Sequence, residues 1–121
     1  MQNKEKYNLE ERTAKFGENV ILMCKRISVD IISKPIISQL IRSSTSVGAN
    51  YAEADDAVSS KDFANKIGIS KKEARETKHH LRMLATAVPY IKKEIGVLWK
   101  EANELNLILN SIYRKVKSKN L

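Results

Sequence analysis

Apolar residues recur at alternating spacings of four and three through this 121-residue chain, and that repeat restricts the fold more than any other feature. Spacing of this kind is typical of an amphipathic helix with one buried stripe. We therefore predict a first helix from about Leu9 to Asp30, with Asn8 as its cap and Glu11 at its third position. Its buried stripe is expected to comprise Leu9, Thr13, Phe16, Val20, Met23 and Ile27.

Three further segments carry the same pattern, and the breaks between them are short. Pro35 suits the first turn of a second helix, because proline lacks an N–H that would have no partner there. Ser59 or Ser60 can cap a third helix that runs to about Val88, and a fourth helix begins near Lys93. Amphipathic helices of about 20 residues with short connections are typical of a bundle. We predict an all-α protein in which residues 1–121 form a single domain, an antiparallel up-down four-helix bundle.

The chain lacks the features of a secreted or membrane protein. It has one cysteine, Cys24, so no disulfide can form within the chain. Its first twelve residues are mostly polar and charged, and its longest apolar run, Val20 to Cys24, is far too short to span a bilayer. We expect a cytoplasmic protein without a membrane partner. Cys24 is expected to be a small hydrophobic residue rather than a reactive thiol.

No motif of an enzyme active site is present. The sequence has neither a phosphate-binding glycine loop nor a zinc-ligand spacing of cysteines. Glu76 and His79 match the E-x-x-H spacing of di-iron bundles, but those bundles require two such motifs. A metal site made by Glu73, Glu76 and His80 is geometrically conceivable, although solvated histidines are the commoner finding. We expect no catalytic residues, no enzymatic activity, no metal and no cofactor.

The net charge of +8 belongs entirely to the second half of the chain. Residues 1–58 hold eight Lys or Arg against eight Asp or Glu, whereas residues 59–121 hold fourteen against six. On the third helix, four cations lie within about 60° in a row roughly 16 Å long: Lys71, Arg75, Lys78 and Arg82. Such a row can follow phosphates in a salt-dependent, sequence-independent way, so these four are the candidate nucleic-acid-binding residues. The alternative is that lysines merely keep the protein soluble.

A second stripe, on the second helix, is polar and compact. Arg42, Ser46, Asn50 and Glu53 fall within roughly 80° of one another, opposite the core face and among small residues. Serine, threonine and asparagine are indifferent helix formers, so helix propensity does not account for this composition. Close approach of another helix, from this chain or from a neighbour, is one interpretation. An ordinary solvated face is the other.

The segment Arg42 to Ala54 resembles the signature R-S-x-x-S-[IV]-x-x-N-x-A-E of a bacterial four-helix-bundle family. That family is named for reading frames found in intervening sequences of large-subunit ribosomal RNA genes. Residues 62–82 are similar to its second block, except at His79-His80, where members often carry Tyr-Trp. The resemblance implies a homopentamer. It also implies kinship with the accessory pentamer of diversity-generating retroelements, a basic barrel that works with a reverse transcriptase and its RNA.

The partners implied are further copies of the chain, RNA or DNA, and a reverse transcriptase or another protein. Because Glu73 and Glu76 belong to the second block, we expect Arg42 to pair with one of them at or near a subunit interface. The candidate interface residues are Arg42, Ser46, Asn50, Glu53, Glu73 and Glu76. The function predicted is a basic, non-enzymatic homo-oligomer associated with nucleic acid. A protein-interaction scaffold with incidental charge is the alternative, and salt-dependent binding distinguishes the two.

Overall fold

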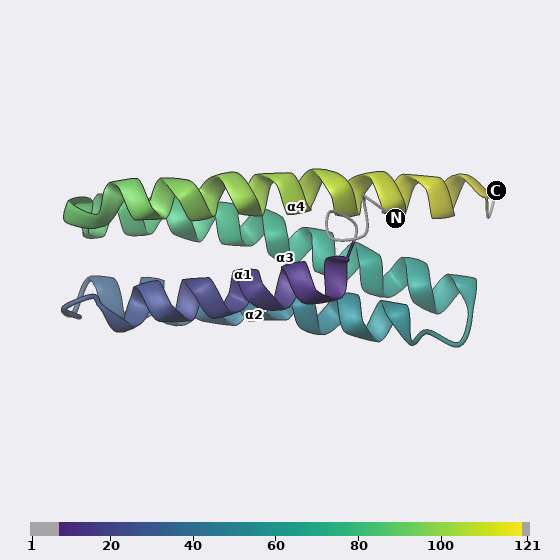
Figure 1. Cartoon of the computed structure of the whole chain (residues 1–121), viewed down its shortest axis with the longest axis horizontal. Helices are drawn as coiled ribbons and strands as arrows, with labels where there is room; N and C mark the ends of the chain where they lie inside the picture. Colours follow the sequence, from purple (N-terminus) through teal and green to yellow (C-terminus); the bar gives the residue numbers. More distant parts are fainter. Residues whose placement is uncertain (1–7, 120–121) are drawn as a thin grey trace.

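The computed structural model describes residues 8–119, which form four α-helices and one short 3-10 helix. The elements are α1 (Leu9–Lys25), α2 (Ser33–Asp55), α3 (Ser60–Ala87), η1 (Pro89–Ile91) and α4 (Lys92–Lys119). Successive helices run in opposite directions, and the α1–α2 and α3–α4 connections lie at the same end of the molecule (Figure 1). The prediction of an all-α, antiparallel four-helix bundle is confirmed.

The core follows the three-four repeat of the sequence. All six stripe positions predicted for the first helix are buried, five of them in α1 and the sixth, Ile27, just after it. The helices α2, α3 and α4 each add leucine or isoleucine side chains to the same apolar cluster. In this core α3 packs against both α2 and α4, and α1 packs mainly against α2, whereas α1 and α4 touch only sparsely. Within residues 8–119, none of the helices is long and apolar enough to cross a membrane.

The predicted caps form, but the end of α1 differs from the prediction. Asn8 accepts a hydrogen bond from the backbone N–H of the third residue of α1, and Ser59 caps α3 in the same way. However, α1 ends at Lys25 rather than at Asp30. The Asp30 carboxylate accepts hydrogen bonds from the backbone N–H groups of Ile32 and Ser33, at 3.0 and 2.8 Å. Asp30 therefore starts the following helix, and it cannot also continue α1.

The small residues of α2 admit neighbouring helices from the same chain. A Cβ atom added at Gly17 of α1 would lie 3.5 Å from the Cα of Thr45, so the two backbones run close together. On the other side of α2, the buried Thr77 of α3 donates a hydrogen bond of 2.9 Å to the hydroxyl of Ser43. These contacts favour close helix approach over a solvated face as the reason for the composition of α2.

Candidate nucleic-acid interface

The positive charge of the chain is concentrated on α3 and α4, which lie side by side. All fourteen Lys and Arg residues of the second half belong to these two helices, together with its six Asp and Glu residues. Whether this excess forms a basic surface depends on where the six carboxylates point, because a carboxylate among the cations would cancel the local field.

Five of the six carboxylates of α3 and α4 contact cations of α1, of α2 or of the residue just after α1. Arg12 of α1 forms ion pairs with Glu101 and Glu104, each at 2.8 Å, and only 18% of its side chain is exposed. Arg26, just after α1, pairs with Glu94. The hydrogen bond to Glu101 is the main cause that raises the pKa of Arg12 above its ordinary value. The acidic side chains of α4 therefore face α1, away from α3.

Arg42 of α2 pairs in a similar way with two carboxylates of α3. One of its terminal nitrogens lies 2.9 Å from the carboxylate of Glu76, and the other lies 3.3 Å from that of Glu73. The bond to Glu76, followed by the charge of Glu73, raises the pKa of Arg42. Arg42 thus pairs with both glutamates within one chain. The location of this cluster at a subunit interface stays a prediction.

The cations of α3 and α4 are mostly left without a carboxylate. Within residues 8–119, Lys66 is the one cation of these helices in an ion pair, at 2.7 Å from Glu53. Eleven of the fourteen are exposed, among them Lys61, Lys72 and Lys100. The two helices consequently present an outer surface with many cations and few free carboxylates, which we call the basic face. It includes the seam between α3 and α4.

The four predicted nucleic-acid-binding residues lie on the basic face in two environments. Arg75 and Arg82 are exposed. Lys71 and Lys78 are half-buried in the seam, where Lys78 donates a hydrogen bond of 2.9 Å to Asn103. The row therefore does not present four equivalent cations. Arg75 and Arg82 are free to bind an external anion, whereas Lys71 and Lys78 also hold α3 to α4.

Residues of α4 that had not been predicted as site residues contribute to the seam. The Lys78 ammonium lies 5.5 Å from the centre of the Trp99 ring, and the Lys71 ammonium lies 4.9 Å from that of Tyr113. The amide of Asn106 donates to the backbone carbonyl of Lys71 at 2.8 Å. The only sequence signal for these residues is their place beside the apolar stripe of α4, which does not reveal which neighbouring helix they face.

The polar stripe of α2 borders α3 rather than standing opposite the core, which corrects the expected orientation. Arg42 and Glu53, at its two ends, pair with residues of α3. Between them, Ser46 donates to the carbonyl of Arg42 at 2.8 Å, and Asn50 donates to the carbonyl of Ser46 at 2.9 Å. The half-buried side chains of Ser46 and Asn50 thus donate to carbonyls of their own helix.

The remaining candidates do not form a reactive site. Within the described part of the chain, no group of three His, Cys, Asp or Glu residues is placed to hold a metal ion. Glu73 and Glu76 are engaged by Arg42, and burial, followed by the charge of neighbouring His79, lowers the pKa of His80. Cys24 is buried, and this burial raises the pKa of its thiol to about 11. A thiol that stays protonated near neutral pH is a poor nucleophile.

The four helices and their packing define a small antiparallel all-α bundle. A model of one family matches residues 5–111, and the chain belongs to this family, the 23S rRNA-intervening sequence proteins. A comparison with curated proteins gives no match.

A solved structure supports the fold. The chain is similar to a protein of unknown function from the S23 ribosomal protein family of Bacteroides thetaiotaomicron, with a TM-score of 0.76 and 29% identity. The alignment covers 86% of this chain and 96% of that one. The similarity therefore extends over nearly the whole bundle, including the helices that carry the basic face.

Proposed function

We propose that this protein is a non-enzymatic homo-oligomer that associates with RNA or DNA through the basic face. The observation that carries the proposal is the separation of charge across the bundle. Arg12, Arg26 and Arg42 engage five carboxylates of α3 and α4 from the side of α1 and α2. The fourteen cations of α3 and α4 are thereby left with little competing negative charge, and such a surface attracts a polyanion.

Self-association is the second part of the proposal. The resemblance to pentameric relatives suggests it, and exposed aliphatic side chains on α1 and α4 support it. Leu22, Val97 and Leu107 are 53%, 69% and 61% exposed. A closed ring repeats the basic face in every subunit, so weak contacts add by multivalency. Sedimentation equilibrium at micromolar concentration tests this part, and a single species of 13.7 kDa would contradict it.

A salt titration of binding tests the association with nucleic acid. The wild-type protein is expected to bind single-stranded RNA and duplex DNA at low salt and to release both as salt rises, because counterions return to the phosphates. The informative variant is R75Q/R82Q, since both arginines are exposed and neither belongs to the seam. If both contact phosphates of duplex DNA, the slope of log affinity against log salt falls by about 1.8.

The matched control removes the same charge elsewhere. K25Q/K34Q changes two exposed lysines of α1 and α2, so it lowers the net charge equally but leaves the basic face intact. The control is expected to keep the wild-type slope, with circular dichroism showing that both variants fold. Equal slopes in the two variants would mean that net charge alone drives binding. No binding by wild type at low salt would reject the proposal.

A protein-interaction scaffold is the second candidate, and a separate observation favours it. At the end of the bundle that holds the α1–α2 and α3–α4 connections, large apolar side chains face solvent. Ile31, Ile32 and Tyr90 are 87%, 63% and 65% exposed. A protein partner such as the reverse transcriptase of the related retroelements would bury such side chains. If the protein binds no nucleic acid, this candidate takes first place.

A further inference from the structure

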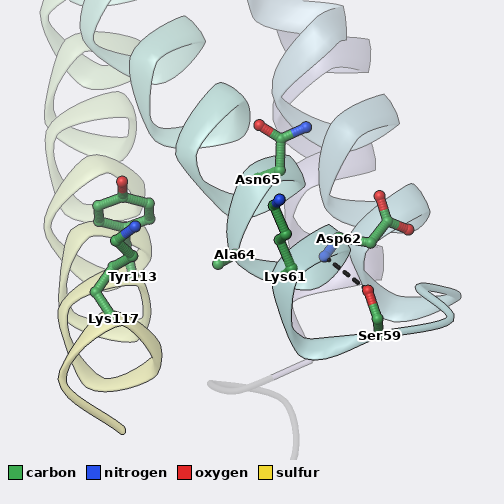
Figure 2. A pocket seen from close by; sticks show the side chains of 7 residues that line it. All are labelled: Ser59, Lys61, Asp62, Ala64, Asn65, Tyr113 and Lys117. Atoms are coloured by element: carbon green, nitrogen blue, oxygen red, sulfur yellow. Dashed lines mark hydrogen bonds between the residues drawn. The ribbon is translucent and has the colours of Figure 1, made fainter. Parts of the chain in front are cut away.

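A hollow of about 530 Å³ lies where α3 begins and α4 ends (Figure 2). On the α3 side it is lined by Lys61, Asp62, Ala64 and Asn65, and on the α4 side by Tyr113 and Lys117. Its volume lies within the range of about 300–1,000 Å³ that is usual for small-molecule sites. The lining combines an aromatic ring, two exposed lysines and an exposed amide, and it belongs to the basic face.

The position of the Tyr113 ring is set by a glycine. A Cβ atom added at Gly68 would lie 3.1 Å from Cε1 of Tyr113, so the absence of a side chain there lets the ring lie against α3. Tyr113 also lines a neighbouring hollow of about 420 Å³ beside Gly68 and Lys72. The half-buried ring packs against the edge of the apolar core and is also a wall shared by the two hollows.

Two flexible cations accompany this ring. The ammonium groups of Lys71 and Lys117 lie 4.9 and 5.9 Å from its centre. At an exposed position such as that of Lys117, a lysine–ring contact is weaker than the stacking of a nucleobase on an aromatic side chain. A base can therefore displace such an ammonium group from the ring, and the released lysine is then available to a phosphate of the same nucleotide.

We propose that this hollow binds an unpaired nucleotide of a single-stranded RNA or DNA, with the base against Tyr113 and the phosphate between Lys61 and Lys117. The proposal rests on the proposed function and specifies the form of nucleic acid. Figure 2 shows Lys61 between Tyr113 and Asp62, with the Asp62 carboxylate on the side away from Tyr113. The phosphate site is thus placed on the lysine side of the hollow. The Asn65 amide offers a donor and an acceptor to the edge of the base.

The chemistry requires an unpaired strand because the faces of bases inside a duplex are already stacked on their neighbours. A duplex is expected to bind mainly to the outer cations of the basic face, that is, to exposed cations outside the hollow such as Arg75 and Arg82. Single-stranded binding should therefore depend on Tyr113, whereas duplex binding should not. This difference separates the hollow from the general attraction of the basic face for phosphates.

The probe is a short single strand that carries a fluorescent purine analogue, compared with the same strand annealed to its complement, in RNA and DNA versions. Tyr113→Leu is expected to weaken single-strand binding about 5- to 150-fold and to abolish the change in fluorescence that stacking produces. Tyr113→Phe keeps the ring and should bind as wild type does. Tyr90→Leu removes an exposed aromatic ring of η1 that lies outside the basic face and does not line this hollow, and it should leave single-strand binding unchanged.

A second variant avoids any loss of folding, since it changes only exposed residues. K61Q/K117Q is expected to lower the salt slope for single strands by about 1.4 and to lower the slope for duplexes by a smaller amount, because a duplex does not place a phosphate between the two lysines. A free mononucleotide is expected to compete only weakly, because it cannot reach the outer cations. Competition as strong as that of the strand would identify a free nucleotide as the ligand and overturn the proposal for a strand.

Three results would overturn the proposal: single-strand binding by Tyr113→Leu at wild-type affinity, equal losses for strand and duplex, or a wild-type protein that binds only duplexes. The last result leaves the proposed function intact, since R75Q/R82Q would still reduce duplex binding. A wild-type protein that binds neither form rejects the proposed function itself. The two failures are therefore distinguishable.

Discussion

Replacement of Gly48 by alanine should destabilise the bundle, although alanine is the better helix former. A Cβ atom at this position would lie 3.2 Å from the hydroxyl oxygen of Thr13 and 3.3 Å from its carbonyl carbon, so it meets the backbone of α1. The Thr13 hydroxyl cannot easily turn aside, because it is buried and donates a hydrogen bond of 2.6 Å to the carbonyl of Leu9. The added methyl group therefore has to push α1 away from α2.

The magnitude follows from two opposing effects. Glycine to alanine in a helix interior gains about 1 kcal/mol from helix propensity, whereas overpacking a well-packed contact costs about 1–3 kcal/mol. We expect Gly48→Ala to lower the free energy of unfolding by about 1 kcal/mol. For a chain of this length that corresponds to a fall of about 3–6 °C in Tm.

Two other glycines provide matched controls on the same scaffold. A Cβ atom at Gly96 would have no neighbouring atom within 4 Å, and one at Gly17 would make only ordinary contacts, at 3.5 Å or more. Gly96→Ala should stabilise by up to about 1 kcal/mol, and Gly17→Ala should be neutral or slightly stabilising. Urea and thermal unfolding followed by circular dichroism measure all three. If Gly48→Ala is as stable as Gly96→Ala, the close contact between α1 and α2 does not constrain this position.

Three further predictions concern charged side chains. Arg12→Met should lower the free energy of unfolding by about 2 kcal/mol in urea titrations, because it removes the cation that bonds the partly buried carboxylate of Glu101 and loosens the sparse contact between α1 and α4; a loss under about 0.5 kcal/mol would show a solvated pair. Arg42→Ala should cost about 1 kcal/mol, since its side chain is 47% exposed and solvent screens its bonds; an unchanged Tm and an unchanged mass would show that Arg42 matters for neither folding nor assembly. Hydrogen bonds from Ser33 lower the pKa of Asp30, so its stabilising effect is present above the unfolded pKa of about 3.9 and disappears as pH falls through the lower folded value. Asp30→Ala should thus be less stable than wild type at pH 7, and the gap should close in strong acid; a gap that is the same at both pH values would contradict this.

The helices and their buried faces were predictable from the sequence, because both are local properties. The three-four repeat places side chains such as Phe16 and Val20 on one face of a helix wherever that helix packs. Caps are local too, since Asn8 and Ser59 bond backbone groups only three residues away. The end of α1 was not predictable in this way. The repeat continues to Ile27, but Asp30 bonds to the next helix instead.

The site depended on tertiary structure, because the partner of a charged side chain is decided by which helix lies beside it. The sequence shows fourteen cations and six carboxylates in the second half of the chain, but not that cations of α1, of α2 or of the residue just after α1 engage five of those carboxylates. It shows the row that contains Lys71 and Lys78, but not that these two lie in the seam with α4. The hollow at Tyr113 joins residues about fifty positions apart, such as Lys61 and Lys117. Helical periodicity sets the direction of a side chain relative to its own axis, whereas only the packing of the four axes determines what that side chain meets.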